Sequence, residues 1–222
     1  LKSLEVPAGL GLIDVGAFSG CVSLETVKLP AGLVAISANA FWDCRSLTSV
    51  ELPDGLEQIG YKAFQWCVAL TRVRLPAGLK HILEHAFEDC EALLEVVVPP
   101  GPKYIGDDAF RRCRSLRTVV LSDGLESIES YAFSLCGALV KVDLPDGLVR
   151  INHGAFACCS SLKSIVLPDS VARIGKRAFA DCSSLTSVVL PGGSVIIGDD
   201  AFPDGCATSV AAAAYTHTYV HT

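Results

Sequence analysis

Residues 41–63 read FWDCRSLTSVELPDGLEQIGYKA, and most of the 222-residue chain consists of variations on this 23-residue stretch. In every copy an alanine precedes a phenylalanine, and an isoleucine lies five residues before that phenylalanine. All nine phenylalanines of the chain share this register: Phe18, Phe41, Phe64, Phe87, Phe110, Phe133, Phe156, Phe179 and Phe202. A fixed period of this length is typical of a solenoid, in which each repeat packs only against its neighbours.

The first part of each repeat has the spacing of a helix. Ile59, Ala63, Cys67 and Leu70 follow one another at intervals of four, four and three residues, which places them on one helical face. This spacing predicts a short helix or 3₁₀ turn over residues 61–67.

The second part of each repeat has the pattern of a strand. Val73 and Leu75 alternate with polar residues, Pro76 ends the strand because it cannot donate to a ladder, and Gly78 supplies the turn. Stacking one such strand per repeat predicts an α/β repeat fold. We expect a curved solenoid of about nine coils, with a parallel sheet on the concave side and short helices or turns on the other.

The repeat covers residues 1–205 as a single domain, and residues 206–222 form a degenerate tail. The final segment, AAAAYTHTYVHT at 211–222, has no apolar period. It is interpreted either as a cap over the last coil, as a disordered segment, or as a translated simple DNA repeat. Because the chain lacks methionine and begins within a repeat, we also expect it to be a fragment or an incomplete gene model.

Charge and hydropathy exclude several classes of function. The net charge of −6 is spread along the chain, and the only dense basic cluster is RRCR at 111–114, so no nucleic-acid surface is indicated. No apolar run approaches the ~20 residues of a bilayer span, and no signal peptide is apparent. The compartment is therefore left open by these features.

Eight of the ten cysteines lie three residues after a repeat phenylalanine: Cys21, Cys44, Cys67, Cys90, Cys113, Cys136, Cys159 and Cys182. Neighbouring rungs of such a ladder would be ~4.8 Å apart with parallel side chains, whereas a disulfide requires Cβ atoms ~3.8 Å apart. Free, buried thiols are predicted, which favours a reducing compartment.

The recurring pattern AF-x-x-C-x-x-L-x-x-V-x-L-P-x-G-L-x-x-I resembles the leucine-rich repeats of the BspA-like, or Treponema-type, class. The resemblance covers nearly the whole chain, from Leu1 to about Phe202. It implies a solenoid used for protein contacts, often on microbial or protist surfaces. It implies no catalysis and supplies no fixed ligand residues.

The sharpest catalytic candidate is HILEH at 81–85, which fits the inverted zinc-peptidase motif H-x-x-E-H. In this interpretation His81 and His85 bind zinc beside Glu84. The alternative is a solvated surface, because these three residues occupy variable positions of the repeat and no third ligand is evident. The acidic pairs at 107–108 and 199–200 are interpreted as favourable charges at helix N-termini rather than as a cation site.

The outward column of the predicted strands is the candidate binding surface. Its N-terminal half alternates in sign through Glu5, Lys28, Glu51 and Arg74, and opposite charges on neighbouring strands support one another. Its C-terminal half, with two residues of an adjacent column, forms what we call the sheet-face strip: Leu94, Val97, Val120, Val140, Asp143, Val166 and Val189. An exposed apolar patch of this kind often marks a contact surface, although valine is also favoured in strands on conformational grounds.

These observations predict a non-enzymatic scaffold that binds a protein ligand on its concave sheet, without a cofactor or a metal ion. The thiol ladder favours an intracellular scaffold, and the family resemblance favours a cell-surface adhesion module. The alternatives are a zinc-dependent hydrolase acting through His81, Glu84 and His85, and a non-functional fragment of an expanded repeat family. Neither nucleic acid nor a membrane span is predicted as a partner.

Overall fold

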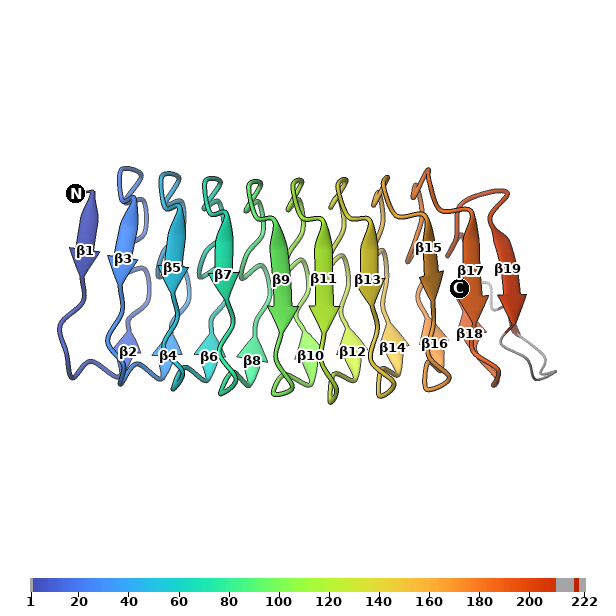
Figure 1. The fold of residues 1–222 in the computed structure, drawn as a ribbon, viewed down its shortest axis with the longest axis horizontal. Coiled ribbons are helices and arrows are strands. Elements are labelled where there is room, and N and C mark those ends of the chain that lie inside the picture. Colours follow the sequence, from blue (N-terminus) through green and yellow to red (C-terminus); the bar gives the residue numbers. More distant parts are fainter. Residues whose placement is uncertain (1, 211–217, 220–222) are drawn as a thin grey trace.

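The structure is a computed structural model of the whole chain, and it describes residues 2–210 and 218–219. The described chain winds into a stack of similar coils, each contributing one longer and one shorter strand (Figure 1). The longer strands are β1 (Ser3–Glu5), β3 (Thr26–Lys28), β5 (Ser49–Glu51), β7 (Arg72–Arg74), β9 (Glu95–Val98), β11 (Thr118–Leu121), β13 (Lys141–Asp143), β15 (Ser164–Val166), β17 (Ser187–Leu190) and β19 (Ala207–Val210). The predicted solenoid with a parallel sheet along one side is confirmed.

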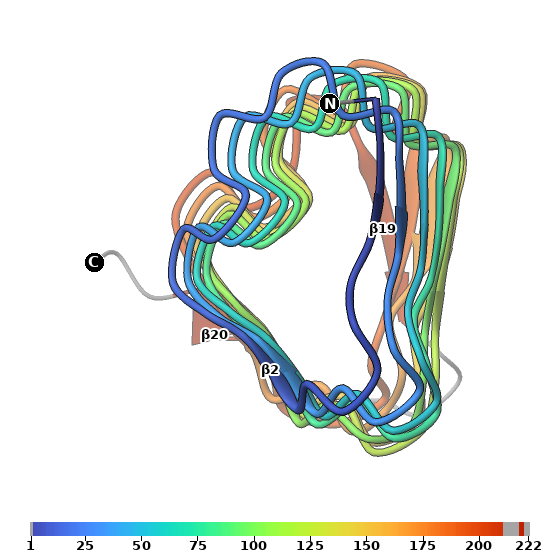
Figure 2. The same cartoon turned by 90° about the vertical axis from the view of Figure 1, so that its left-hand side faces the viewer.

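Each coil also contains a second, shorter strand that the sequence pattern did not predict. In the nine repeats this strand is formed by the repeat isoleucine and the residue before it. These strands are β2 (Leu12–Ile13), β4 (Ala35–Ile36), β6 (Gln58–Ile59), β8 (His81–Ile82), β10 (Tyr104–Ile105), β12 (Ser127–Ile128), β14 (Arg150–Ile151), β16 (Arg173–Ile174), β18 (Ile196–Ile197) and β20 (Thr218–Tyr219). They form one continuous parallel sheet of ten strands. Viewed along the stack, the two rows of strands run down different sides of the same outline (Figure 2).

Residues 61–66 form consecutive turns, and the structure contains no helix within the residues that it describes. The backbone N–H groups alternate in their partners: Gln65 donates to Lys62 of its own coil at 3.2 Å, whereas Phe64 donates to Ala86 of the next coil at 2.8 Å. Lys62 and Trp66 have φ values of 56° and 64°, which a right-handed helix cannot contain. Bonds between coils therefore replace the i to i−4 bonds of the helix that was one predicted alternative.

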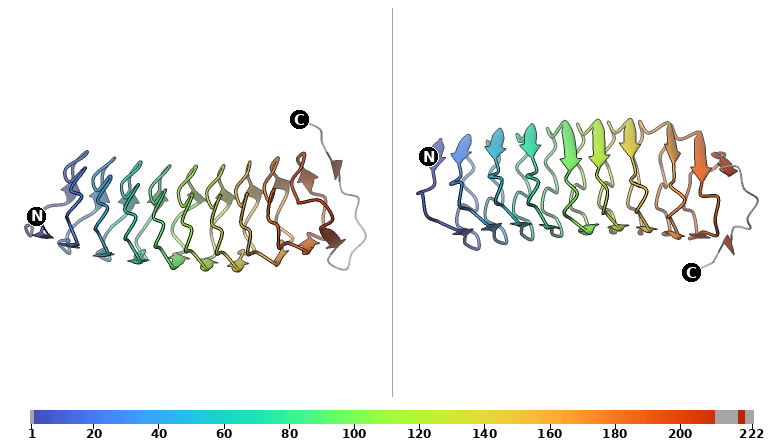
Figure 3. Two further views of the ribbon diagram at one scale, coloured as in Figure 1. Left: turned by 90° about the horizontal axis from the view of Figure 1, so that it is seen from above. Right: turned by 60° about the horizontal axis from the view of Figure 1, so that its bottom comes forward.

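The absence of helices explains why the stack is only gently bowed (Figure 3). Helices would space successive coils at 8–10 Å on one side against ~4.8 Å on the strand side, which bends a solenoid strongly. Here the turn side is also bonded from coil to coil at strand spacing. Stacked phenylalanine rings on that side have centroids 5.2–5.5 Å apart.

The core consists of ladders of identical side chains, as the repeat predicted. Seven of the phenylalanines, from Phe41 to Phe179, are fully buried, together with the repeat alanines, isoleucines and leucines of the same coils. In the three-residue strands the middle residue points inward and its neighbours point outward; in β7, Val73 is buried while Arg72 and Arg74 are exposed. This alternation fixes which side chains the long-strand sheet presents to solvent.

All ten cysteines are free, as predicted. In the ladder, each inner thiol donates to the backbone carbonyl of the phenylalanine 26 residues earlier; Cys136 reaches Phe110 at 3.2 Å. Burial raises the pKa of Cys44 and of Cys136 to about 12. These thiols are therefore uncharged packing groups that also satisfy a buried carbonyl.

The C-terminal boundary predicted at residue 205 falls just before a strand. Ala207–Val210 form β19, which pairs with β17, and the main chain of Thr218–Tyr219 pairs with β18. The alanine run at 211–214 lies outside the described residues, so the interpretations of that segment stay predictions.

Candidate functional site

The outer face of the long-strand sheet has the two halves that the sequence predicted. In the N-terminal half, Lys28 Nζ lies 2.7 Å from Glu5 Oε1, and Glu51 is the register partner of Arg74 on the neighbouring strand. The Lys28–Glu5 pair is well exposed to solvent, so it contributes little to stability. The Lys28–Glu5 pair requires no ligand to explain its charges, whereas among the described residues Glu51 and Arg74 face each other in register without an ion pair.

The C-terminal half presents apolar side chains to solvent. Val166 is 65 % exposed, Val140 51 %, Val97 47 % and Leu94 41 %. The remaining members of the sheet-face strip are Val120 and Val189, which are half-buried, and Asp143, whose Oδ2 lies 2.8 Å from Lys141 Nζ. The structure therefore brings the seven predicted residues onto one face, with four large apolar groups in contact with solvent.

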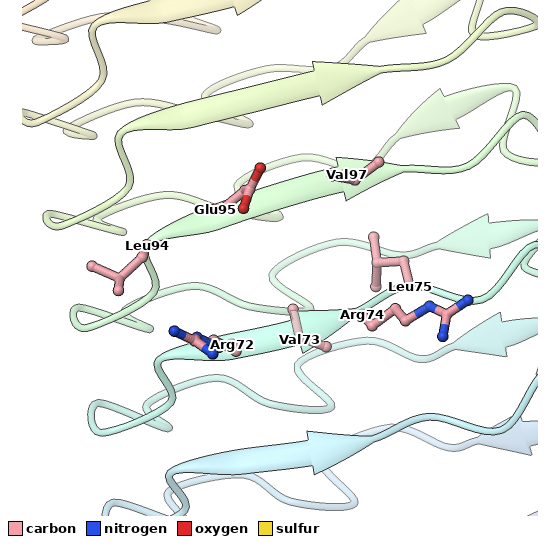
Figure 4. Close-up of a pocket in the computed structure, with 7 residues that line it drawn as sticks. All are labelled: Arg72, Val73, Arg74, Leu75, Leu94, Glu95 and Val97. Carbon is pink, nitrogen blue, oxygen red and sulfur yellow. The ribbon is translucent and has the colours of Figure 1, made fainter.

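The row of longer strands is not one continuous sheet. Its pairing stops between β7 and β9 and again between β13 and β15, which divides it into sheets of four, three and three strands. At the first interruption a groove of about 560 Å³ opens between β7 and β9 (Figure 4). It is lined by Arg72, Val73, Arg74, Leu75, Leu94, Glu95 and Val97. Sequence reasoning missed this groove because residues 72–75 follow the same pattern as every other repeat.

The HILEH segment does not have the geometry of a zinc peptidase. His81 lies on the strand β8 with its side chain exposed, and His85 has a left-handed φ of 57° within the following turns. A zinc-peptidase motif requires its two histidines one turn apart on the same helix. The zinc-hydrolase alternative therefore lacks the helix on which it depends.

His85 instead joins an acidic cluster that spans two coils. Its Nδ1 lies 2.8 Å from Glu88 Oε2 and 4.0 Å from Asp108 Oδ2, and these three residues could in principle hold a metal ion. Arg111 contacts both acids, with Nη1 3.2 Å from Asp108 and 3.7 Å from Glu88, and so offsets part of their negative charge. The arrangement is that of an ion-paired structural network.

The same network continues along the rod as a polar ladder. Trp42 Nε1 donates to Gln65 Oε1 at 3.0 Å, and the Gln65 amide donates to Glu88. Gln65 and Glu88 are both 6 % exposed, so the side-chain amide N–H of Gln65 depends on Glu88 for its hydrogen bond. The spacing of 23 residues between successive members could have revealed this ladder in the sequence.

Replacing Glu88 with alanine is expected to lower the free energy of unfolding by about 1–3 kcal/mol, because the buried Gln65 amide loses its acceptor. Urea unfolding monitored by circular dichroism would measure the change. Glu91→Ala is the matched control, since the Glu91 side chain is 44 % exposed and its pair with Arg114 is worth about 1 kcal/mol at most. Equal losses in the two variants would contradict the structural role of the ladder.

The acidic pairs do not lie at helix N-termini, so that interpretation is wrong. Asp107 Oδ1 accepts a hydrogen bond from the backbone N–H of Ser130 in the next coil at 2.7 Å. Asp108 and Asp200 have left-handed φ values of 54° and 53°, a conformation that aspartate tolerates better than most residues. These aspartates are therefore turn residues.

The basic cluster at 111–114 is matched by acids of the preceding coil. Besides Arg111, Arg112 Nη1 lies 3.8 Å from Asp89 Oδ2, and Arg114 Nε lies 3.6 Å from Glu91 Oε1. The arginines of this cluster are therefore paired within the rod. No helix capable of spanning a bilayer occurs among residues 2–210 and 218–219.

The comparison with family models matches the BspA type leucine rich repeat region, in six copies, over residues 1–117 and 84–209. No curated protein matches the chain. Among solved structures, the leucine-rich repeat protein of Treponema pallidum is 36 % identical, with a TM-score of 0.67, over 72 % of this chain and 78 % of that one.

Two further structures cover almost all of this chain. A leucine-rich repeat protein of Bacteroides ovatus is 23 % identical over 98 % of this chain and 69 % of its own, with a TM-score of 0.66. A leucine rich cell surface protein of Faecalibacterium prausnitzii is 28 % identical over 99 % of this chain, with a TM-score of 0.59, and this chain spans 60 % of its length. The repeat pattern, the stacked coils and these matches together show that the chain belongs to the BspA-type leucine-rich repeat family.

Proposed function

We propose that the solenoid is a rigid scaffold that binds a protein ligand through the sheet-face strip. The observation that carries this proposal is the exposure of Leu94, Val97, Val140 and Val166 together on one face of the rod. Burying exposed apolar side chains against a partner is the dominant favourable term in most protein association. The mixture of valines with paired charges resembles the composition of a binding face with a polar rim.

Membership of a repeat-scaffold family supports this proposal, because repeat solenoids bind partners along extended surfaces. A role in adhesion at a cell surface is supported by the Faecalibacterium prausnitzii protein, which is described as a cell surface protein. Buried thiols are compatible with either compartment, because the ladder geometry excludes pairing between neighbouring rungs whatever the redox potential.

A double substitution, Val97→Lys with Val166→Lys, is expected to abolish ligand binding without unfolding the rod, because both side chains project into solvent. The measurement is affinity capture from cells that make the protein, with wild-type and variant proteins immobilised side by side. The control is Val34→Lys with Ile196→Lys, which changes equally exposed apolar residues away from the long-strand sheet. A protein captured by the wild type and the control but lost by the strip variant supports the proposal. Capture that all three proteins share would reject it.

A further inference from the structure

We propose that the groove between β7 and β9 is the anchor point for the ligand, and that it takes an aliphatic side chain adjacent to a carboxylate on an extended protein segment. This inference rests on the proposed function, because it names the chemistry of a partner that the sheet face would bind. The groove lies at the N-terminal end of the sheet-face strip and shares Leu94 and Val97 with it.

The apolar part of the site consists of two buried and two partly exposed side chains. Val73 and Leu75 are each 7 % exposed, whereas Leu94 and Val97 are partly open to solvent. A ligand side chain that enters between β7 and β9 would therefore contact all four aliphatic groups. Buried anchors of this kind carry most of the binding energy in protein interfaces.

The charged part of the site comes from Arg72 and Arg74, which project from β7 (Figure 4). Within the described part of the chain, neither guanidinium has an acid within ion-pair distance, unlike Lys28 with Glu5 and Lys141 with Asp143. Glu95 lies across the groove, and its carboxylate points away from both arginines (Figure 4). Two arginines without acidic partners beside an apolar groove are complementary to a carboxylate, which arginine can bind through two parallel hydrogen bonds.

The backbone adds polar groups to the site. The Leu94 N–H donates to the Thr71 carbonyl at 3.2 Å, but no ladder joins β7 to β9 beyond this bond. The main chain at Val73 and Val97 therefore lacks strand pairing on the side that faces the groove. A ligand segment that lies over the groove can bond to these main-chain groups.

The test uses random dodecapeptides displayed on phage and selected on the purified protein, followed by fluorescence anisotropy with synthetic copies of the selected peptides. We expect enrichment of leucine, isoleucine or valine next to aspartate or glutamate. Arg72→Ala with Arg74→Ala should weaken these peptides tenfold or more, the scale expected for loss of a charge-assisted hydrogen bond. Arg72→Gln with Arg74→Gln provides a second variant that keeps polar side chains. Lys141→Ala, in the same column as Arg72, should leave the affinity unchanged.

Three results would overturn the inference: no enriched peptide, enrichment without acidic residues, or affinities that the arginine variants do not change. If the arginine substitutions leave the peptide affinity unchanged but Val97→Lys with Val166→Lys abolishes binding, the groove is rejected as the anchor point and the sheet-face strip is retained as the binding face. Peptides unaffected by every variant would count against both. If no peptide is enriched, the groove is rejected but the sheet-face strip is not. Binding by the sheet-face strip is tested separately, by affinity capture of whole proteins.

Discussion

Replacing Phe110 with alanine is expected to lower the free energy of unfolding by about 3–5 kcal/mol, the usual cost of deleting a buried aromatic ring. Phe110 is fully buried, and its ring centroid lies 5.2 Å from that of Phe87 and 5.3 Å from that of Phe133. The substitution therefore removes two stacking contacts and leaves a cavity in the middle of the rod. Because each coil is stabilised only by its neighbours, we expect the two halves of the rod to lose their cooperativity as well.

Guanidinium unfolding followed by circular dichroism would measure both effects, as a lower midpoint and a shallower transition. Phe18→Ala is the matched control. Phe18 is only partly buried and has one ring neighbour among the described residues, Phe41. A loss as small for Phe110 as for Phe18 would show that the ring ladder contributes little to stability.

The second large effect is a steep loss of stability at alkaline pH. The pKa of Cys136 is raised from the ordinary value of 9.0 to about 12 by burial, and burial raises the pKa of Cys67 and Cys113 well above 9. Below pH 9 the thiols are protonated in both the folded and the unfolded state, so their contribution to the free energy of unfolding is fully present. Above pH 9 the unfolded chain loses protons that the folded chain keeps. Each thiol then lowers the free energy of unfolding by about 1.4 kcal/mol per pH unit.

Urea unfolding between pH 8 and pH 10.5 would measure this slope. Other groups also titrate in this range, so the comparison is with Cys136→Ala. That variant should be less stable at pH 8. Above pH 9, however, its free energy of unfolding should fall less steeply than that of the wild type, by about 1.4 kcal/mol per pH unit, because one thiol fewer titrates. Parallel pH profiles for the two proteins would show that the Cys136 thiol does not titrate as a buried group.

The solenoid could be predicted because the same apolar residues recur every 23 residues along the whole repeat region. A phenylalanine, a cysteine and an isoleucine that recur every 23 residues can all be buried only if successive repeats stack in register, and the strand alternation at Val73 and Leu75 then fixes the outward column. Val97 and Val166 were located from this column, and the structure places them at the surface.

What the sequence could not supply depends on contacts between coils. The interval of four residues from Ala63 to Cys67 fits a helix, but the backbone of Phe64 bonds to the next coil and Lys62 adopts a positive φ. Local spacing cannot reveal that the backbone bonds to the next coil instead of within its own segment. The interruption between β7 and β9 is similar, because it arises from the relative placement of two strands whose own sequences fit the repeat.

Equal coil spacing on both sides of the rod has a consequence for how such a gene can evolve. Because strands and turns repeat at the same distance, inserting or deleting a whole 23-residue unit changes the length by ~4.8 Å and leaves every other coil in register. A gain or loss of one residue would instead shift a side chain from the interior to the solvent. Unequal recombination between repeats can therefore lengthen or shorten this molecule in discrete steps, so that copy number sets how far its outermost coil extends.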